Sequence, residues 1–230
     1  LPYQMEAAYT DLSTIDLPMT VGTWRSVGHS QNAFFTECFM DECAHALGKD
    51  PYRSRREILT KHPRYLAVLD KLAEISNWNV DPDPGIFRGL ALHKSFGSIV
   101  GEVVEISIDG KRLSIDKVYC VIDCGRTVNP AIIESQMQSG IAYGLTAALY
   151  GEIEVKKGKI VQSNFPNYEM VKMGTMPRVV TYIMEVDAYP GGVGEPGTPP
   201  IAPALCNAIF AATGERIKSL PLTKHGFVIV

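Results

Sequence analysis

The sequence has no strong excess of charge of either sign. Its 230 residues contain 22 lysines and arginines against 25 aspartates and glutamates, which gives a formal net charge of -3. Proteins that bind nucleic acid neutralise its phosphates with a basic surface, so this balance argues against a nucleic-acid partner. Apolar residues make up 46% of the chain and charged residues 20%, a composition typical of a globular protein with a buried core.

Long hydrophobic runs are also missing. No apolar stretch approaches the roughly 18 to 20 residues that a helix needs to span a bilayer, so we expect no transmembrane segment in these residues. The most apolar stretches, 140–150 and 202–212, contain glycine or polar interruptions that are typical of buried helices. The chain starts at Leu1, and its first residues lack the charged and apolar regions of a signal peptide. The sequence therefore leaves the compartment open.

Cysteine is scarce, and its spacing matches no known metal or cluster motif. The chain has five cysteines, namely Cys38, Cys43, Cys120, Cys124 and Cys206. None forms a C-x-x-C pair, and no cluster of cysteine and histidine has zinc-binding or iron–sulfur spacing. We expect free thiols, most of them buried, rather than a disulfide framework. His29 and His45 are interpreted as a loop residue and a solvated helix residue rather than as metal ligands.

The first part of the chain has helical periodicity. Ser30 is placed to cap a helix over residues 31–47, which Gly48 would end. On this helix one face is apolar and the acidic residues lie elsewhere; the apolar residues are Phe35, Phe39, Cys43 and Leu47, and the polar ones are Glu37, Asp41 and His45. Further helices are expected from Asp50-Pro51 onward and over residues 63–76.

Beyond the proline-rich loop at 81–85 the pattern changes from helical to strand periodicity. A hairpin turn at Asp109-Gly110 predicts paired strands on either side. We expect strands over residues 99–108, 113–123 and 179–187, a second hairpin around 157–158, and helices over 130–150 and 201–213. The predicted fold class is α+β. Residues 1–85 would form a mainly helical region that contains the loop 24–30, and residues 86–230 a region of mixed sheet and helices.

The most distinctive motif is the glycine- and proline-rich run at 191–200, GGVGEPGTPP, which precedes a helix of small residues. Glycines before a helix allow a ligand to approach the backbone, and the amides at a helix start favour anions. Glu195 lies between Gly194 and Pro196, where the backbone has little freedom. Taken alone, the motif is either a surface loop with a solvated glutamate or an anion-binding module, although no Walker-type lysine follows the glycines.

A series of ordered blocks resembles the xanthine dehydrogenase and aldehyde oxidase family, most of all the branch of the isoquinoline 1-oxidoreductase beta subunit. The blocks are WRSVGHSQNAF at 24–34, DE and AHALGKDP within 41–51, VIDCGRTVNP at 121–130, QMQSG at 136–140, SNFPNY at 163–168, GVGEPG at 192–197 and LPL at 220–222. They extend over essentially the whole chain. Large subunits of this family are longer, so we expect the chain to be the C-terminal part of a molybdopterin-binding subunit.

The resemblance implies a catalytic role for Glu195. In this family the matching glutamate lies beside molybdenum and acts as a general base, taking a proton from the oxygen that attacks the substrate. Gln136 matches a glutamine that hydrogen-bonds the pterin, for which its amide offers donors as well as an acceptor. Without the resemblance, Gln136 would be interpreted as a polar residue near a helix start. Asp123 is interpreted as a structural residue.

Further contacts to the cofactor are implied by the same resemblance. Arg25 and Ser26 match a loop that relatives place against the cofactor, with Ser26 at a position where other branches have glycine. The main chain of Gly192, Val193 and Gly194 would lie against the metal-ligand region. Val27 matches an aromatic residue that stacks on substrate in other members, so an aliphatic side chain there leaves the substrate open. No protein side chain is expected to ligate the metal.

The implied activity is the oxidation of an N-heterocycle or an aldehyde, with water as the oxygen source. The cofactor would be a molybdopterin-type molybdenum cofactor in its cytosine dinucleotide form. Electrons would pass to a small subunit with [2Fe–2S] clusters and then to a cytochrome c or another acceptor. Many complete enzymes of this branch are periplasmic or membrane-associated.

The alternative is a truncated or excised, non-catalytic domain that only packs against partner segments. The upstream part of the same subunit would be the first such partner. Because those further segments complete the cofactor cavity in the family, we expect the isolated chain not to hold the cofactor tightly.

Overall fold

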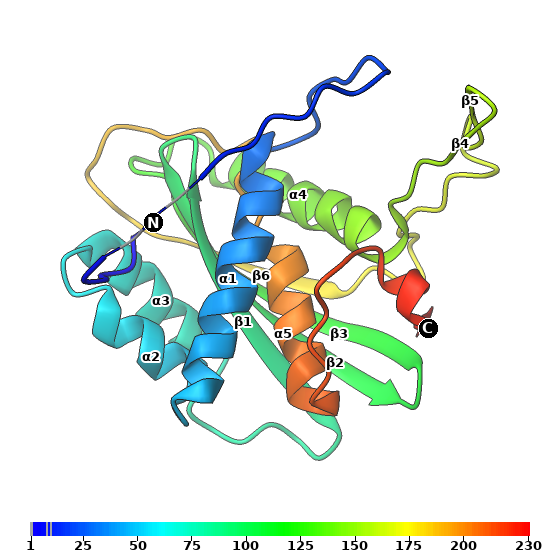
Figure 1. The fold of residues 1–230 in the computed structure, drawn as a ribbon. Helices are drawn as coiled ribbons and strands as arrows, with labels where there is room; N and C mark the ends of the chain where they lie inside the picture. The colour runs from blue at the N-terminus through cyan, green and yellow to red at the C-terminus, as the bar shows by residue number, and fades with distance from the viewer. Residues whose placement is uncertain (1, 8, 10) are drawn as a thin grey trace.

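A computed structural model describes residues 2–7, 9 and 11–230, and it confirms the α+β class. Three helices come first: α1 (Gly28–Ala46), α2 (Pro51–Ile58) and α3 (Pro63–Ile75). The remaining elements are β1 (Ile86–Ser95), β2 (Ser98–Asp109), β3 (Arg112–Asp123), α4 (Pro130–Tyr150), β4 (Val155–Lys156), β5 (Lys159–Ile160), β6 (Arg178–Ile183), α5 (Ile201–Thr213), the 3-10 helix η1 (Leu222–His225) and β7 (Val228–Ile229). Figure 1 shows the helices gathered around one central sheet.

The central sheet has the order β1-β2-β3-β6. Strands β1, β2 and β3 form an antiparallel meander, β6 runs parallel to the end of β3, and β7 runs parallel to its start. The hairpin predicted at Asp109-Gly110 and the helix boundaries predicted for α4 and α5 are confirmed. The strand predicted over residues 179–187 already ends at Ile183, and the second hairpin is only two residue pairs long.

Strand β1 was missed by the sequence interpretation because its residues do not alternate cleanly between apolar and polar. Four consecutive residues, 89–92, are buried, since this strand has protein on both faces. Gly89 shows how close the packing is, because a Cβ atom there would lie 2.2 Å from the backbone nitrogen of Ala208 in α5. The glycine is therefore required by contact between α5 and the sheet.

Alternate residues of the strands face two separate cores. One face of the sheet packs against α1, α4 and α5, where Val100, Val104 and Ile122 meet Met137 and Ile209. The opposite face packs against α2 and α3; its members include Leu59, Val68, Leu72, Leu90, Val103 and Val121. Figure 1 shows α1 and α5 lying side by side across the first face. Because both faces of the sheet are covered, most residues of β2 and β3 are buried.

Helix α1 corrects the sequence interpretation in two ways. It begins at Gly28 rather than after Ser30, because Ser26 and Val27 adopt positive φ values of 71° and 48° and turn the chain into the helix earlier. Ser30 lies inside the helix, where its hydroxyl donates to the Arg25 carbonyl at 3.1 Å and caps nothing. His29 is likewise a residue of the first turn and not of a loop.

The face of α1 that carries Phe35 and Phe39 points outward, whereas Ala33, Phe34, Met40 and Ala44 of the same helix are buried. Phe35 and Phe39 are 62% and 60% exposed, whereas Glu37 and Asp41 are 1% and 2% exposed. The buried carboxylates are paired: Asp41 lies 2.6 Å from the Arg216 guanidinium, beyond α5. The buried polar residues of α1 therefore help to fix the helix to the domain, whereas Phe35 and Phe39 remain on the surface.

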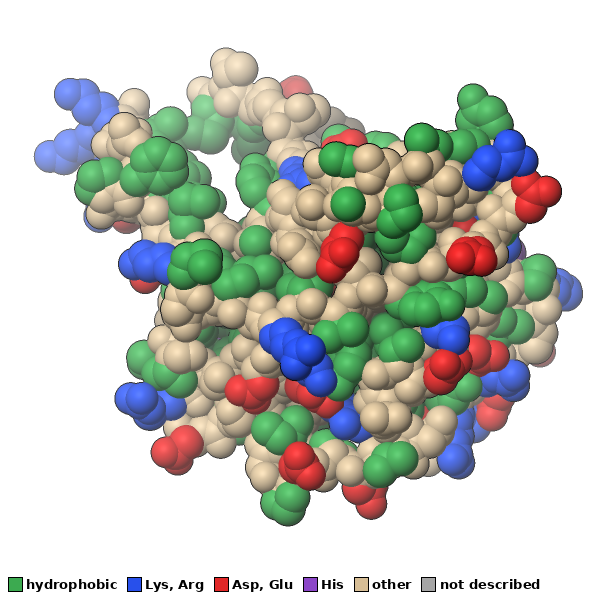
Figure 2. All heavy atoms as spheres, turned by 180° about the vertical axis from the view of Figure 1, so that it is seen from behind, with side chains coloured by type: hydrophobic (Ala, Val, Ile, Leu, Met, Phe, Trp, Pro, Cys, Tyr) green, Lys and Arg blue, Asp and Glu red, His purple; other side chains and the backbone are tan. Residues whose placement is uncertain are grey.

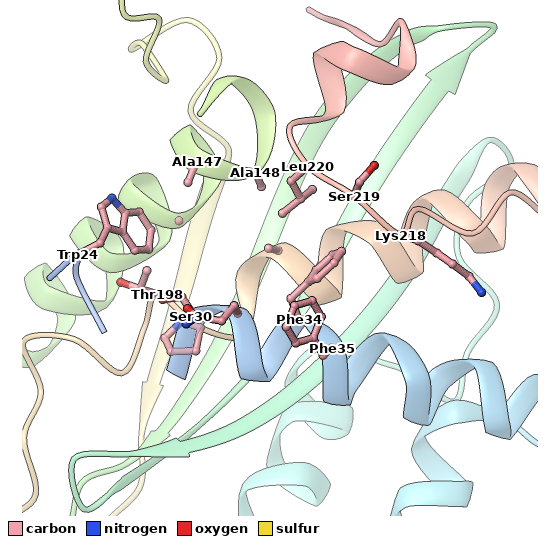
Figure 3. Close-up of a pocket in the computed structure, with 14 residues that line it drawn as sticks. Trp24, Ser30, Phe34, Phe35, Ala147, Ala148, Thr198, Lys218, Ser219 and Leu220 are labelled. Carbon is pink, nitrogen blue, oxygen red and sulfur yellow. The ribbon is translucent and has the colours of Figure 1, made fainter. Parts of the chain in front are cut away.

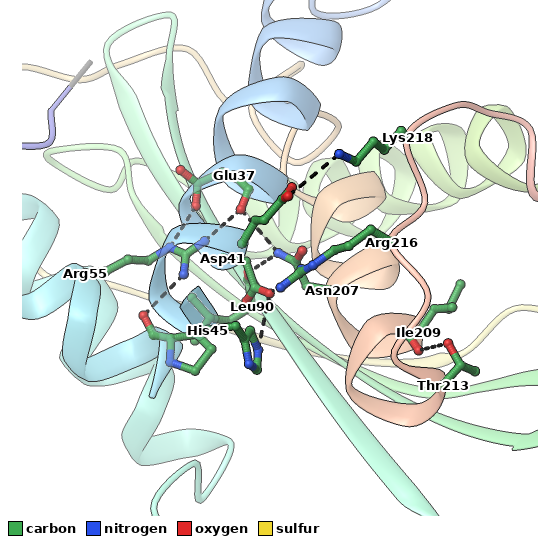
Figure 4. A network of polar contacts seen from close by, with 12 residues as sticks. Glu37, Asp41, His45, Arg55, Leu90, Asn207, Ile209, Thr213, Arg216 and Lys218 are labelled. Carbon is green, nitrogen blue, oxygen red and sulfur yellow. Dashed lines mark hydrogen bonds and ion pairs between the residues drawn. The ribbon is translucent and has the colours of Figure 1, made fainter. Parts of the chain in front are cut away.

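Glu37 is the centre of a buried polar network (Figure 4). Its carboxylate accepts hydrogen bonds from Tyr3 Oη at 2.6 Å, from Arg55 Nε at 3.0 Å and from the Leu92 amide at 3.1 Å. Burial acts to lower the pKa of Arg55, but the charge of Glu37 outweighs it and the pKa rises. Burial, followed by the charge of Glu37, raises the pKa of Tyr3. The network joins the N-terminal segment, α1, α2 and β1.

The surface carries charges of both signs. Figure 2 shows acidic and basic side chains interspersed with hydrophobic ones on the face opposite that of Figure 1. A small group of exposed lysines, Lys156, Lys157 and Lys159, lies on the protruding β4–β5 hairpin. Within the described residues, no helix is both long and apolar enough to cross a membrane.

Glu102 is a buried carboxyl group without a partner. It lies on β2, on the same face as Val100 and Val104, and is fully buried. Neither carboxyl oxygen has a hydrogen-bond partner among the described residues. Burial raises the pKa of Glu102 well above its usual range. Burial therefore favours the uncharged carboxylic acid over the carboxylate in the folded protein.

We predict that Glu102→Gln stabilises the fold at neutral pH and not at acidic pH. Below the unfolded-state pKa of about 4.3, the carboxyl group is protonated in both states, so its raised folded-state pKa does not change the free energy of unfolding. Above that pH the unfolded chain loses this proton more readily, so Glu102 increasingly lowers the free energy of unfolding. The variant removes this penalty, so its gain in unfolding free energy should reach about 1–3 kcal/mol at pH 7. Urea unfolding at pH 4 and pH 7 measures the difference.

Glu105 provides the control for this prediction. It lies on the same strand but forms an ion pair with Arg88 at 2.9 Å, so Glu105→Gln should be neutral or destabilising at pH 7. An equal effect of Glu102→Gln at both pH values would show that Glu102 has a partner in solution.

Candidate functional site

The turn at 191–200 is held against the ends of three strands. The Gly191 amide donates to the Cys124 carbonyl at 2.8 Å, and the Gly192 amide donates to the Phe96 carbonyl at 2.7 Å. In return, Ser98 Oγ donates to the Gly192 carbonyl at 2.7 Å. A Cβ atom at Gly191 would lie 2.4 Å from Ser98 Oγ, so only glycine fits there. These contacts fix the turn to the β1–β2 hairpin and to the end of β3.

Helix α4 packs closely against the second half of the turn. A Cβ atom at Gly140 would lie 3.0 Å from the Gly197 backbone, and one at Gly144 would lie 2.9 Å from the Thr198 carbonyl. The Thr198 amide donates to the Glu195 carbonyl at 3.0 Å, and residues 196–200 are buried. Small residues thus let α4 approach closely enough to fix the backbone on the C-terminal side of Glu195.

Ser26 makes two contacts with Glu195. Its amide donates to Glu195 Oε1 at 2.9 Å, and its hydroxyl donates to the Glu195 carbonyl at 2.7 Å. Ser26 is fully buried and Glu195 is half-buried. The other carboxylate oxygen, Oε2, has no hydrogen-bond partner among the described residues. The carboxylate therefore has one oxygen held by the protein and one available to a ligand.

The Ser26 and Val27 backbone is strained. Both residues have φ values in the left-handed region, which is unfavourable for residues other than glycine and costs about 1–3 kcal/mol each. In this chain Ser26 offsets the strain with its hydrogen bonds to Glu195. Val27 follows as the N-cap residue of α1 and is 50% exposed.

Arg25 joins three segments of the chain. Its Nε donates to the Gly194 carbonyl at 2.9 Å, and Nη2 donates to the same carbonyl. Nη1 donates to Ser139 Oγ at 2.9 Å and Nη2 donates to Gln136 Oε1 at 3.1 Å. The segment at 24–26 therefore lies between α4 and the turn that carries Glu195, and all the predicted site residues except Val27 belong to this one cluster or adjoin it.

The spacing of α4 could have revealed two residues that the sequence interpretation missed. Ser139 and Tyr143 follow Gln136 by three and seven positions, so all three lie on one face of the helix. The Tyr143 ring lies 4.7 Å from the Trp24 ring and 5.6 Å from the Arg25 guanidinium carbon. Tyr143 thus contacts both Trp24 and Arg25.

Besides the free Glu195 oxygen, which is an acceptor, the cluster has hydrogen-bond donors without a partner in the described part of the chain. Among the described residues, neither the Val193 amide nor the Gly194 amide has an acceptor, and the Gln136 amide nitrogen has none either. Gly192 and Gly194 are exposed, so a ligand can reach this backbone. A set of backbone and side-chain donors fits a ligand rich in oxygen and nitrogen acceptors, such as a pterin.

An apolar groove lies beside the cluster (Figure 3). Its volume is about 360 Å³. Trp24, Phe34, Phe35 and Leu220 contribute its large apolar side chains, and Thr198 and Pro199 of the turn form part of its wall. The groove continues onto the exposed aromatic face of α1.

The other residues considered from the sequence have structural contacts. Asp123 accepts two hydrogen bonds of 2.7 Å from Arg64 and one of 3.0 Å from the Gly125 amide. Burial acts to raise the pKa of Asp123, but these hydrogen bonds and the Arg64 charge outweigh it and lower the pKa. His45 lies on the helix surface, 3.5 Å from Asp41.

The histidines and cysteines do not assemble a metal site. His29 Nδ1 lies 3.0 Å from His93 Nε2, and burial together with His29 lowers the pKa of His93 to about 4. All five cysteines are free thiols, and three of them are buried. Within the described part of the chain, no group of three or more histidine, cysteine or acidic side chains could hold a metal ion.

Comparisons with known proteins agree on one class. Residues 82–177 match the model of the molybdopterin cofactor-binding domain. The chain is 34% identical over 227 residues to the isoquinoline 1-oxidoreductase beta subunit from Brevundimonas diminuta, covering 96% of this chain and 29% of that protein. It is 25% identical to a nicotinate dehydrogenase subunit from Pseudomonas putida, covering 96% of this chain and 20% of that protein.

A solved structure shows the same fold. The crystal structure of quinoline 2-oxidoreductase from Pseudomonas putida 86 matches with a TM-score of 0.78 at 12% identity, covering 88% of this chain and 52% of that one. The match at residues 82–177 identifies a molybdopterin cofactor-binding domain. The chain belongs to the xanthine dehydrogenase and aldehyde oxidase family. It spans only 29% of the isoquinoline relative, so similarity alone does not assign the activity of the whole enzyme.

Proposed function

We propose that this chain forms part of the active site of a molybdenum hydroxylase, with Glu195 as the general base. The observation that carries the proposal is the contact between Ser26 and Glu195, which joins two motifs that are 169 residues apart in the sequence. Arg25 adds Gln136 to the same cluster at 3.1 Å. A base must be held within hydrogen-bond reach of the proton that it removes, and this arrangement restricts the Glu195 side chain accordingly.

One group of residues would bind the cofactor, and Glu195 would accept the proton. When bound, the molybdenum cofactor supplies two-electron redox chemistry. The Gln136 amide and the main chain of Gly192, Val193 and Gly194 would hold it, and Arg25 and Ser26 would keep these groups in place. Glu195 Oε2 would accept the proton as oxygen is transferred to the substrate, while Oε1 stays bound to the Ser26 amide.

The substrate would be an N-heterocycle or an aldehyde, with Val27 at its pocket and water as the oxygen source. The names of the relatives support this range, since they include an isoquinoline and a nicotinate enzyme. We further propose the cytosine dinucleotide form of the cofactor and a [2Fe–2S] partner subunit that passes electrons onward to a cytochrome c or another acceptor. The helical region 1–85 would position the segment 24–30, which includes the start of α1, and residues 86–230 would provide the other cofactor contacts.

Isotope labelling tests the proposed reaction. We expect the holoenzyme that contains this chain to oxidise isoquinoline, nicotinate or an aromatic aldehyde, and to introduce one oxygen atom from water. Turnover in ¹⁸O-labelled water, followed by mass spectrometry of the product, shows whether the new oxygen atom comes from water. Product that takes its oxygen from O₂, or the absence of turnover with all three substrates in enzyme loaded with molybdenum, would contradict the proposal.

A non-catalytic packing domain is the second candidate, and one observation favours it. The aromatic face of α1 is exposed at Phe35 and Phe39, and it adjoins the apolar groove. Contiguous exposed apolar surface is typical of a face that packs against another protein segment. A purely structural domain would not depend on the Glu195 carboxylate, so substitution of Glu195 separates the two functions.

A further inference from the structure

Arg25 determines which end of the Gln136 amide can face a ligand. A guanidinium group has five N–H donors and no acceptor, so only the oxygen of the Gln136 amide can face it. The hydrogen bond from Arg25 Nη2 to Gln136 Oε1, at 3.1 Å, is of this kind. The Gln136 NH₂ group must therefore point away from Arg25.

The guanidinium cannot turn to accommodate the opposite amide orientation. It is held by the Gly194 carbonyl, by Ser139 Oγ at 2.9 Å and by the Tyr143 ring. If the amide flipped, its NH₂ group would meet the donors of Arg25, and a charge-assisted hydrogen bond would be lost. A glutamine without such a neighbour could offer either end to a ligand.

The NH₂ group of Gln136 remains available on the ligand side. Gln136 is half-buried, and no described residue accepts a hydrogen bond from its nitrogen. The residue lies next to the exposed Gly194, where an added Cβ atom would be 3.8 Å from Gln136 Oε1. The Gln136 amide contains a donor and an acceptor, but only its NH₂ donor faces the ligand side.

We infer that Arg25 is a positioning residue that makes Gln136 an obligatory hydrogen-bond donor, and that the pterin atom opposite Gln136 is an acceptor. The inference rests on the proposed function for the identity of the ligand. It narrows the sequence expectation, in which the Gln136 amide served a ring edge of mixed polarity. An unprotonated ring nitrogen or a ring carbonyl oxygen would satisfy it.

Cofactor retention tests the donor role. In the holoenzyme that contains this chain, Gln136→Glu keeps an acceptor for Arg25 but replaces the donor that faces the ligand. We expect molybdenum content after gel filtration to fall about 10- to 100-fold. The control is Gln138→Glu, which makes the same change on an exposed residue of α4 and should retain the wild-type content. Wild-type content in Gln136→Glu would overturn the inference, because the ligand atom would then not be an acceptor.

A second measurement needs no cofactor and tests Arg25 directly. In the cofactor-free chain, Gln136→Glu gives Arg25 an acceptor, whereas Gln136→Lys confronts it with another donor of the same charge. We expect Gln136→Glu to keep Tm near the wild-type value and Gln136→Lys to lower it by several degrees. Equal Tm values would show that Arg25 does not face this amide. If wild-type holoenzyme held no molybdenum while the Tm contrast persisted, the proposed function and the pterin contact would fail but the role of Arg25 would stand.

Discussion

Glu195→Gln lowers kcat of the holoenzyme by about 10²- to 10⁴-fold, the range typical of the loss of a general base. Glutamine is a suitable replacement because its amide oxygen can still accept the Ser26 amide, which donates to Glu195 Oε1 at 2.9 Å. The backbone contact from Ser26 Oγ is also unaffected. Molybdenum content and Tm should therefore stay at their wild-type values, which separates loss of proton transfer from loss of structure.

Glu185→Gln is the matched control for this experiment. Glu185 is exposed, follows β6 and has no ion pair among the described residues, so the same change of charge there should leave kcat unaltered. Steady-state rates for both variants, each corrected for molybdenum content, make the comparison. If Glu195→Gln retained activity within about tenfold of the wild type, Glu195 would not be the base.

Arg55→Met lowers the free energy of unfolding by about 3–5 kcal/mol, because it leaves the Glu37 carboxylate buried without its cation. Both side chains of this pair are at most 1% exposed, so water cannot replace the lost partner. The loss is a large part of the total stability of a typical domain, about 5–15 kcal/mol. Urea unfolding of the purified chain at pH 7 measures it.

Two variants check the cause of this loss. Arg56→Met changes the next residue of α2, whose ion pair with Asp70 is largely exposed, and its effect on stability should be much smaller. Adding Glu37→Gln to Arg55→Met removes the unpaired charge and should recover at least half of the stability. If Arg55→Met and Arg56→Met had equal effects, the network around Glu37 would not be important for folding.

Much of the fold could be predicted from the sequence because several elements have strong local signals. The Asp50 cap, the Asn129-Pro130 helix start and the Asp109-Gly110 turn define boundaries through contacts between near neighbours. Strand β1 lacks such a signal. Its Gly89 reflects contact with α5, more than a hundred residues away in the chain, and local periodicity contains no information about that contact.

The orientation of α1 was beyond sequence reasoning for a related reason. Periodicity identifies the two faces of the helix, but it does not reveal that Arg55 and Arg216 lie where Glu37 and Asp41 can be buried with them. Burying a charged carboxylate is costly unless a cation pairs with it. The predicted apolar face that contains Phe35 and Phe39 is therefore exposed, while Glu37 and Asp41 are buried.

The residues of the candidate site were predicted from family motifs, whereas the contacts between them are seen only in the structure. The sequence placed Arg25, Gln136 and Glu195 in one site only through resemblance, because they lie on three separate segments. The hydrogen bonds from Ser26 to Glu195 and from Arg25 to Gln136 could not be derived from spacing. Ser139 and Tyr143 could have been found, since they share a helix face with Gln136. Catalysis by Glu195 and the division of the chain at residue 85 stay predictions.

A high-resolution structure of the molybdenum-loaded holoenzyme tests the role of Glu195 most directly. We expect the free carboxylate oxygen of Glu195 to face the metal across the space where the reacting oxygen lies. It should be within about 3 Å of that oxygen or joined to it by one water molecule, and the Gln136 NH₂ group should contact the pterin. A Glu195 side chain turned into bulk solvent, or a metal bound away from Gln136 and Arg25, would contradict the proposed active site.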